Sequence, residues 1–361
     1  MSRSYIANWM LSNDLTHRCN SGYSLAMAEM EPFALGTFAS AGPTFAGLVR
    51  DDRVAALGPH LGADVSLRAL LDDWARAWPQ LTRLSARLRA DDFAYALEEL
   101  RPLPPVAPAG QIFQAGANYR QHVLDLMAAA AARGDNSDGL TDAHRTRARA
   151  ELEHRLAHGR PFVFLGSAHA MVGARDDVVL PATCLQPDWE LELAAVIGRP
   201  ARHVARDTAL DHVAGYTIAN DVTARDALMR SDARDLGLDW LAGKCAPTFL
   251  PVGPLFVPAA FVPDPMDLRI RLTVNGEVMQ DESTADMVFD VAALIEFISE
   301  VSELRPGDLV LTGSPAGNGA GHGVFLQPGD VMVGEITGLG RQRNRCVAEV
   351  ATTVQGEPQA A

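Results

Sequence analysis

Asp188-Trp-Glu-Leu-Glu-Leu-Ala-Ala-Val-Ile197 predicts an apolar β-strand that carries two acidic residues. Successive side chains of a strand point to opposite faces, so Glu190 and Glu192 project together while the leucines face the core. Two neighbouring carboxylates on an apolar strand repel each other, and desolvation strengthens this repulsion unless a cation lies between them. A solvent-facing edge strand is the alternative, and this segment alone leaves it open.

A third carboxylate follows a second apolar strand. Gly215-Tyr-Thr-Ile-Ala219 predicts this strand, and Asp221 comes just after its end. Three carboxylates without suitably spaced Cys or His side chains favour a hard, oxygen-preferring ion, Mg²⁺ or Mn²⁺. Asp221 is also compatible with a turn or a helix N-cap, and spacing does not separate these interpretations.

The composition is that of an ordinary soluble protein. Of the 361 residues, 48% are apolar and 21% are charged, and the length suggests two domains or one large domain with an appendage. Lys plus Arg number 31 against 45 Asp plus Glu, which gives a net charge of −14. This charge argues against nucleic-acid and membrane-surface partners but not against small anionic substrates, because a local cation can reverse the sign within a cleft.

Cysteine usage and hydropathy predict a cytoplasmic protein. The four cysteines lie far apart, which argues against a disulfide framework and a zinc–thiolate site. No window of 18 apolar residues predicts a transmembrane helix, and the N-terminus lacks the pattern of a signal peptide. The four are Cys19, Cys184, Cys245 and Cys346.

Many strands with few regular β–α alternations predict an α+β fold. Apolar spacing predicts helices over Ser66–Leu84 and Ala90–Leu100. Asn275-Gly276 between two strand-like segments predicts a tight hairpin, because such a turn needs positive φ angles.

The domain organisation follows from a proline-rich boundary at residues 101–108. We expect a small accessory α/β domain over 31–105 and a catalytic domain over 110–350, with a helical insertion over 127–160. The remaining terminal segments are expected to be a poorly ordered N-terminal extension over 1–30 and a C-terminal tail over 351–361.

Several blocks in register carry a resemblance to the fumarylacetoacetate hydrolase family, over roughly residues 110–350. In order along the chain they are Gly116-Ala-Asn-Tyr-Arg-Gln-His122, Asp188-Trp-Glu-Leu-Glu192, Gly215-Tyr-Thr-Ile-Ala-Asn-Asp-Val-Thr-Ala-Arg-Asp226, Gly243-Lys244, Val274-Asn-Gly-Glu277, Pro306-Gly-Asp308 and Thr312-Gly-Ser-Pro-Ala-Gly317.

The resemblance implies a mixed β-roll domain that usually forms a homodimer and holds Mg²⁺ or Mn²⁺ at the mouth of the roll. Carried over by position, Glu190, Glu192 and Asp221 match the metal ligands. His122 matches the general base, and Asp125 falls where many relatives have a glutamate that orients this histidine. A capped or core histidine is the alternative for His122, and only the matched loop argues against it.

Further positions match groups that contact the substrate. Lys244 is expected in the catalytic set, where it would pair with the substrate carboxylate or a nascent oxyanion. The expected substrate-binding residues are Asn118, Tyr119, Arg225, Thr312 and Ser314.

Two positions depart from the family pattern. Relatives often carry Phe-Leu-Lys-Pro where this chain has Phe164-Leu165-Gly166-Ser167, so a family lysine is absent. Asp125 is one methylene shorter than the usual glutamate, which changes its reach to the histidine. Both departures bear on the reaction more than on metal binding.

The implied chemistry is hydrolysis of a C–C bond in an acylpyruvate-like β-diketone acid. Such an acid chelates the ion through adjacent oxygens, and cleavage leaves an enolate that a dication stabilises. His122 would take a proton from water, with Asp125 holding its ring. Decarboxylation, isomerisation or hydration of a 2-oxo or 2-hydroxymuconate-type acid is the alternative, and a ligand-binding protein without turnover is the alternative outside the enzymes.

Two other motifs give weaker evidence for a functional site. The Gly-rich segment 313–323 fits neither a dinucleotide-binding fingerprint nor a serine nucleophile elbow. Glu151, His154 and His158 share one predicted helical face, for which a solvated surface is favoured over a zinc site.

Overall fold

The computed structural model describes residues 31–40, 42–134, 141–230, 232, 235 and 237–350. The expected N-terminal extension, residues 1–30, and the expected tail, residues 351–361, lie outside the described residues.

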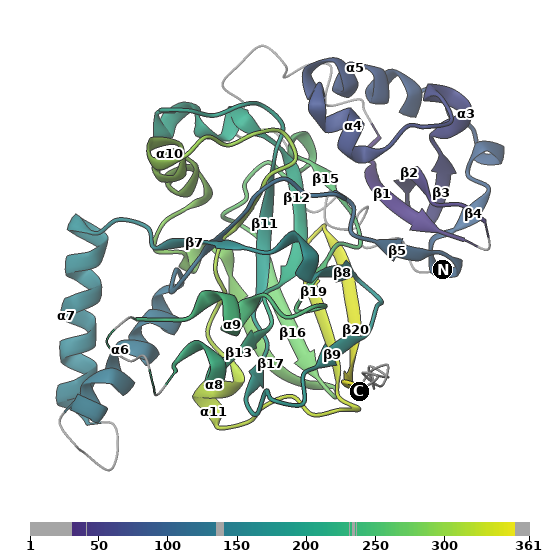
Figure 1. The fold of residues 1–361 in the computed structure, drawn as a ribbon. Coiled ribbons are helices and arrows are strands. Elements are labelled where there is room, and N and C mark those ends of the chain that lie inside the picture. The colour runs from purple at the N-terminus through teal and green to yellow at the C-terminus, as the bar shows by residue number, and fades with distance from the viewer. Residues whose placement is uncertain are drawn as a thin grey trace, which may run out of the picture.

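An N-terminal sheet with the strand order β4-β3-β2-β1-β5 comes first in the chain (Figure 1). Neighbouring strands within it pair antiparallel, as apolar strands joined by short turns commonly do. Its elements are β1 (Ala34–Ala39), β2 (Phe45–Arg50), β3 (Arg53–Ala56), β4 (Tyr95–Ala96), β5 (Arg101–Leu103), α3 (Gly58–Leu61), α4 (Leu67–Asp72) and α5 (Trp74–Ser85).

Two of the expected helices need correction. The helix expected over Ser66–Leu84 is broken at Asp73, whose side chain accepts a hydrogen bond from Arg76 N and starts a new helix. The helix expected over Ala90–Leu100 is wrong. Two short 3₁₀ turns flank β4 there, because Tyr95 pairs with Val54 in the sheet.

The rest of the chain forms two main sheets, one of eight strands and one of five. One sheet has the order β7-β6-β18-β11-β12-β14-β8, with β15 also on β12, and the other has the order β17-β16-β19-β20-β9. The first contains β6 (Ile112–Ala115), β7 (Val163–Gly166), β8 (Met171–Gly173), β11 (Leu191–Ile197), β12 (Val213–Asn220), β14 (Leu250–Val252), β15 (Val257–Pro258) and β18 (Leu309–Leu311). The second contains β9 (Val178–Leu180), β16 (Arg269–Val274), β17 (Glu277–Ser283), β19 (Val331–Ile336) and β20 (Gly340–Ala348), and β10 (Pro187–Asp188) pairs separately with β13 (Thr223–Ala224).

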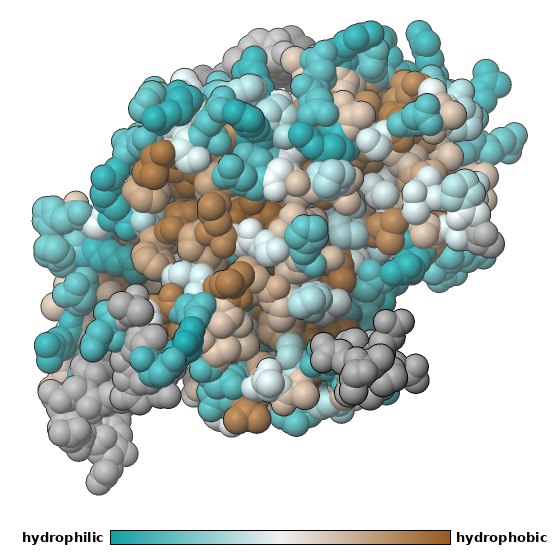
Figure 2. Space-filling view, in the orientation of Figure 1, coloured by the Kyte–Doolittle hydropathy of each residue, from teal (hydrophilic) through white to brown (hydrophobic). Residues whose placement is uncertain are grey.

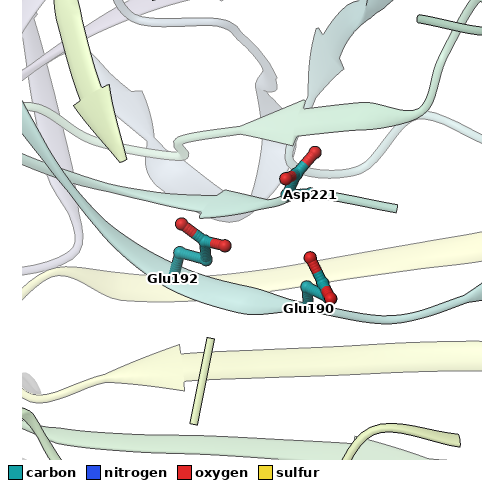
Figure 3. Close-up of side chains that lie close together, drawn as sticks. All are labelled: Glu190, Glu192 and Asp221. Atoms are coloured by element: carbon teal, nitrogen blue, oxygen red, sulfur yellow. The ribbon is translucent and has the colours of Figure 1, made fainter. Parts of the chain in front are cut away.

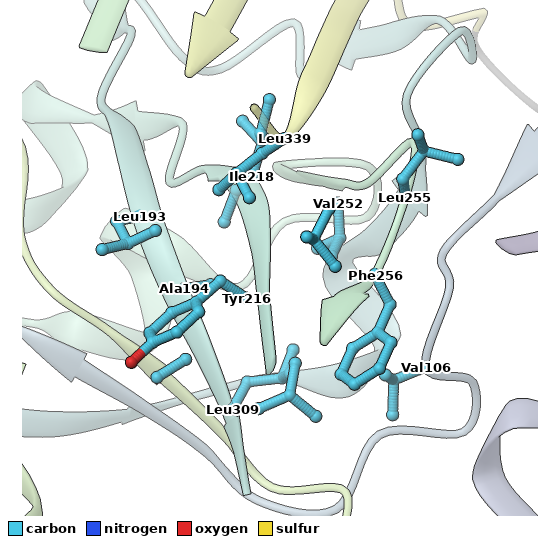
Figure 4. Close-up of a cluster of buried hydrophobic side chains, with 14 of the residues drawn as sticks. Val106, Leu193, Ala194, Tyr216, Ile218, Val252, Leu255, Phe256, Leu309 and Leu339 are labelled. Carbon is cyan, nitrogen blue, oxygen red and sulfur yellow. The ribbon is translucent and has the colours of Figure 1, made fainter. Parts of the chain in front are cut away.

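β11 and β12 lie at the centre of the first sheet, and every residue of both strands is buried. The second sheet packs closely on them. A Cβ added at Gly334 of β19 would come within 2.5 Å of a Leu191 side-chain carbon, so a larger residue there would displace Leu191. Figure 4 shows the apolar core beside these strands, including Leu193 and Ile218. Parallel and antiparallel pairs occur together, and the fold is α+β as expected.

The hairpin between β16 and β17 is confirmed. Asn275 and Gly276 have φ values of 52° and 88°, as a tight two-residue turn requires.

The helices that follow the N-terminal sheet are α6 (Arg120–Gly134), α7 (Asp142–His158), α8 (Arg225–Leu228), α9 (Trp240–Lys244), α10 (Val291–Val301) and α11 (Gly319–His322). Of these, α6 and α7 form a pair that projects from the side of the molecule away from the N-terminal sheet (Figure 1).

The N-terminal sheet is tied to the larger part. Leu35 of β1 and Phe256 exchange two backbone hydrogen bonds of 2.8 Å. The rings of Trp74 and Phe256 meet edge-to-face with centroids 5.4 Å apart. One continuous apolar core therefore runs through both parts.

Candidate metal centre

Three buried carboxylates converge where β11 begins and β12 ends. In the antiparallel register Leu191 lies opposite Asn220, so Glu190 and Asp221 meet just beyond the paired residues. Glu190 and Glu192 project from the same side of β11 (Figure 3). One oxygen from each of the three side chains lies within 4.8 Å of the others. The expected convergence of these residues is observed, and the edge-strand alternative is wrong because β11 lies between β12 and β18.

Two cations lie against this cluster. Lys244 Nζ, on α9, contacts Glu190 Oε2 at 2.5 Å and Asp221 Oδ2 at 2.6 Å, and its side chain is buried. Arg225 Nη2, at the start of α8, donates to Glu190 Oε1 at 2.6 Å. Glu190 is therefore held from both sides, whereas Glu192 accepts a hydrogen bond of 2.7 Å from the backbone N–H of Gly313.

The pKa shifts follow from this uneven pairing. Burial would raise the pKa of Glu190, but Lys244 and Arg225 bring it down to about 2. Burial and the neighbouring Asp221 and Glu190 raise the pKa of Glu192 well above its usual value. Burial also raises the pKa of Asp221, to about 6, against the opposing effect of Lys244.

The residues present fit a divalent cation. When all are ionised, the three carboxylates and Asp188 carry four negative charges against the two positive charges of Lys244 and Arg225, so a dication would balance the remaining two. Asp221 Oδ1 is buried and lacks a hydrogen-bond partner among the described residues. A donor set of carboxylate oxygens suits a hard ion such as Mg²⁺ or Mn²⁺.

Asp188 anchors the cationic side of the site. Its fully buried carboxylate accepts hydrogen bonds from the backbone N–H groups of Trp189, Gly319 and Ala320. Asp188 Oδ2 also accepts one of 2.8 Å from Arg225 Nε. The guanidinium expected to contact substrate is thus already fixed between two acidic side chains of the chain.

His122 and Asp125 lie about one turn apart near the start of α6, and the charge of Asp125 is among those that act on the His122 ring. His122 is half-buried on the first turn of α6, and burial lowers its pKa, so the ring is neutral at neutral pH. The charges that act on it include those of Glu190 and Arg225, which places the ring beside the acidic cluster. Asp125 is exposed, and its Oδ1 accepts a hydrogen bond of 2.9 Å from Gln121 Nε2.

The expected substrate-binding residues of the Gly116–Tyr119 loop are buried within the chain. Asn118 Nδ2 donates to the carbonyls of Thr312 and Phe289, and its Oδ1 accepts from Phe289 N. Tyr119 is completely buried, and burial raises the pKa of its hydroxyl. Asn118 therefore fixes this loop against the segment that follows β18.

That segment carries the last two expected residues. Thr312 Oγ1 donates to the Leu193 carbonyl at 3.0 Å. Ser314 Oγ accepts from Gln280 Nε2 at 2.8 Å. Gly313, between them, has a φ of 87° and aims its N–H at Glu192, so the loop acts on the site through its backbone.

Three residues of the site were missed as individual contributors by the sequence analysis. Asp188 and Gly313 belong to quoted blocks, but sequence gives no sign that one anchors Arg225 and the other binds Glu192. Gln114, on β6, is 2% exposed and acts to lower the pKa of Asp221. A buried glutamine in an apolar strand was the available signal.

The acidic cluster stands alone among the described residues as a group of three or more potential ligands close enough to share an ion. The zinc alternative at Glu151, His154 and His158 is therefore not supported.

Comparison with known proteins agrees with these features. The family model described as "Fumarylacetoacetate (FAA) hydrolase C-terminal" matches residues 111–347. The chain belongs to the fumarylacetoacetate hydrolase family. The members of this family found by the comparisons include hydrolases, isomerases and tautomerases, so the chain belongs to a family of enzymes.

Two curated members illustrate the range. A 2,4-didehydro-3-deoxy-L-rhamnonate hydrolase of Sphingomonas sp. (strain SKA58) is 37% identical over 274 residues, which cover 74% of this chain and 85% of that protein. The mitochondrial oxaloacetate tautomerase FAHD2B of Homo sapiens is 44% identical over 189 residues, which cover 52% of this chain. The match spans 59% of the tautomerase's own length.

Solved structures of the family share the fold. The fumarylacetoacetate hydrolase of Exiguobacterium antarcticum is 28% identical with a TM-score of 0.69, and the alignment covers 88% of this chain and 100% of that one. The maleylpyruvate hydrolase of Sphingobium sp. SYK-6, solved with manganese(II) and pyruvate, is 26% identical with a TM-score of 0.64 over the same shares.

The helices of the described residues are all too short or too polar to cross a lipid bilayer.

Proposed function

We propose that this chain is a divalent-metal-dependent hydrolase that cleaves a C–C bond in an acylpyruvate-like β-diketone acid. The observation that carries the proposal is the convergence of three buried carboxylates with an uncompensated charge. The manganese and pyruvate in the maleylpyruvate hydrolase structure support both the ion and the substrate class. Mg²⁺ and Mn²⁺ are equally suited to this donor set.

In this proposal Glu190, Glu192 and Asp221 hold the ion. A dication there would polarise the substrate carbonyl and stabilise the enolate left by C–C cleavage. Lys244 and Arg225 keep the ligands aligned and offset their charge, and they offer positive charge to an anionic substrate.

His122 accepts a proton from water in this scheme. Its lowered pKa leaves the ring neutral at neutral pH, as a general base requires. Asp125 would orient the ring through its second carboxylate oxygen, while its Oδ1 accepts from Gln121. Asn118, Tyr119, Thr312 and Ser314 shape the pocket by fixing its two loops.

Keto–enol tautomerisation of a 2-oxo acid is a second candidate. The tautomerase relatives favour it, and proton transfer within the substrate needs no activated water. Both reactions use the same ion and the same base.

A product assay separates these candidates. Acetylpyruvate and enol-oxaloacetate are offered with Mn²⁺ while enol absorbance is followed, and products are separated by chromatography. Hydrolysis adds one water to acetylpyruvate and releases acetate and pyruvate, whereas tautomerisation returns the keto acid unchanged in composition. Absence of turnover for both substrates would contradict the proposal and favour a ligand-binding protein.

We further propose a homodimer. Phe162, Leu165 and Leu241 are large apolar side chains that are 49%, 57% and 76% exposed. They belong to the region of β7 and α9, where Figure 2 shows apolar surface. Exposed apolar patches of this kind commonly mark a protein–protein contact.

A further inference from the structure

Gln114 is a buried amide that the proposed chemistry leaves without a role. It lies on β6 and is 2% exposed. Its Oε1 atom has no hydrogen-bond partner among the described residues. A buried acceptor without a donor is unfavourable for stability, so its presence on a strand of the sheet calls for an explanation.

The amide lies beside a metal-ligand candidate. Gln114 lies opposite Phe164, whose ring centroid is 6.0 Å from Lys244 Nζ, and Lys244 Nζ binds Asp221 Oδ2 at 2.6 Å. The effect of Gln114 in lowering the pKa of Asp221 agrees with this placement. Asp221 Oδ1, the oxygen that Lys244 does not bind, lacks a partner at normal hydrogen-bonding distance among the described residues. The amide therefore lies on the side of the sheet where Asp221 has an unpartnered oxygen.

Gly166 provides the space for this amide. β6 pairs with β7 so that Gln114 lies opposite Phe164 and diagonally opposite Gly166, on the same face of the sheet. A Cβ added at Gly166 would lie 2.1 Å from Gln114 Oε1. Any side chain at position 166 would therefore push the amide out of its place.

We propose that Gln114 is a positioning residue for Asp221, and that position 166 is glycine because the Gln114 carboxamide occupies the space of its side chain. The amide donates toward the carboxylate and limits the rotation of Asp221, which keeps its free oxygen directed at the ion. This inference rests on the proposed role of Asp221 as a ligand.

The test measures Mn²⁺ affinity by calorimetry for Gln114→Ala, Gly166→Ala and the double variant, beginning with the wild type. We expect each single variant to bind Mn²⁺ about tenfold or more weakly, as loss of a group that orients a ligand commonly does. Gly166 has no positive φ, so alanine fits its backbone, and the clash falls on the end of a flexible side chain. This variant is expected to fold even if Gln114→Ala does not.

Coupling between the two positions gives the decisive readout. Because Gly166→Ala acts by displacing Gln114, it should have little further effect once Gln114 is alanine, and the two losses should not add. A general structural role would lower the melting temperature of the metal-free protein without this pattern.

Gln342 supplies the matched control. It is also a buried glutamine with an unpartnered Oε1 among the described residues, but its Nε2 donates to the backbone carbonyls of Ile218 and Pro251. Gln342→Ala should lower stability and leave Mn²⁺ affinity within about twofold of the wild type.

Two outcomes overturn the inference. Unchanged Mn²⁺ affinity in both single variants would remove the role of Gln114, and additive losses would separate it from Gly166. If the wild type itself fails to bind Mn²⁺, the proposed function fails first, which keeps the two failures distinguishable.

Discussion

Glu192 differs from the other two carboxylates of the site in its electrostatic surroundings. Lys244 binds Glu190 and Asp221, and Arg225 binds Glu190, whereas Glu192 has its hydrogen bond from the neutral N–H of Gly313. Burial and two like charges therefore raise its pKa. A divalent cation beside Glu192 would remove this penalty.

We predict that Glu192→Gln stabilises the metal-free protein and weakens metal binding. Because the folded-state pKa of Glu192 is raised, the protonated form favours folding, and stability falls as the pH rises through that pKa. Glutamine cannot ionise and can still accept from Gly313 N. At pH 8 the melting temperature should rise by on the order of 2 °C, with Mn²⁺ affinity at least about tenfold weaker.

Differential scanning calorimetry and Mn²⁺ titration check this prediction. Glu192→Asp, which keeps the charge, is the control and should not raise the melting temperature. A lower melting temperature for Glu192→Gln, with affinity preserved, would mean that Glu192 is a structural residue.

The protonation of His122 should determine how kcat/KM depends on pH. A general base must be neutral, and burial lowers the pKa of His122. With saturating Mg²⁺, the decrease of kcat/KM on acidification should therefore have its midpoint below pH 6.5. His122→Ala should reduce kcat by about 10²–10⁴ and leave Mn²⁺ affinity unchanged. A variant that keeps full activity would assign the base elsewhere.

At the scale of residues, the sequence predicted the cluster of carboxylates better than the side chains that bind them. The alternation of Glu190 and Glu192 on an apolar strand implies a shared face, because strand geometry fixes it. The ion pair between Lys244 and Glu190 joins residues 54 positions apart, and local patterns carry no sign of it. The Gln121 contact of Asp125 depends on rotamers, which sequence does not determine.

At the scale of elements, the register of β11 and β12 builds the site. Leu191 opposite Asn220 brings Glu190 to Asp221, and the Asp221 N–H donates to the Glu190 carbonyl at 2.8 Å. A shift of one residue would turn Glu190 and Glu192 to the other face. The apolar strands were predictable, but their register depends on contacts between distant segments.

The two helix errors have the same origin. A helical apolar pattern continues across Asp73, yet the cap at this residue divides it. At Ala90–Leu100 the pairing of Tyr95 with Val54 outweighs local helix propensity. The Asn275-Gly276 hairpin was predictable because its turn geometry is determined by those two residues alone.

We expect Asp188 to hold together the elements around Arg225, because its carboxylate binds Arg225 and the start of α11. Asp188→Asn removes the negative charge and replaces one carboxylate oxygen with an NH₂ group. The side chain then loses either the Oδ1 contacts with Trp189 N and Gly319 N or the Oδ2 contacts with Ala320 N and Arg225 Nε. We expect a loss of about 3 kcal/mol in the free energy of unfolding, because a buried cation loses a partner. Denaturant unfolding measures this loss.

The exposed pair of Arg269 and Asp281 is the control for this variant. Asp281→Asn should change stability by less than about 1 kcal/mol, since exposed ion pairs contribute little. Equal effects of the two substitutions would show that Asp188 does not hold the site together.

At the scale of the whole molecule, the apolar surface of β7 and α9 predicts self-association. Leu241→Asp places a charge at a side chain that is 76% exposed, so it should leave the monomer folded and weaken the proposed dimer. Light scattering with size-exclusion chromatography should give a dimer for the wild type and a lighter species for the variant. Leu185→Asp, at a side chain 75% exposed elsewhere, is the control. A monomeric wild type would contradict the proposed dimer.

The α+β class and the larger domain were predictable from strand frequency and matched blocks. The packing of the N-terminal sheet on the rest was not. Phe256 meets Leu35 and Trp74 across more than 180 residues, and no local pattern indicates which apolar faces will meet. The domain limits at 31–105 and 110–350 stay a proposal.

The most direct test of the central claim is a crystal structure grown with Mn²⁺ and measured for anomalous scattering. We predict one strong peak per chain, coordinated by carboxylate oxygens of Glu190, Glu192 and Asp221. Absence of a peak there, with Lys244 and Arg225 still binding the same oxygens, would contradict the claim.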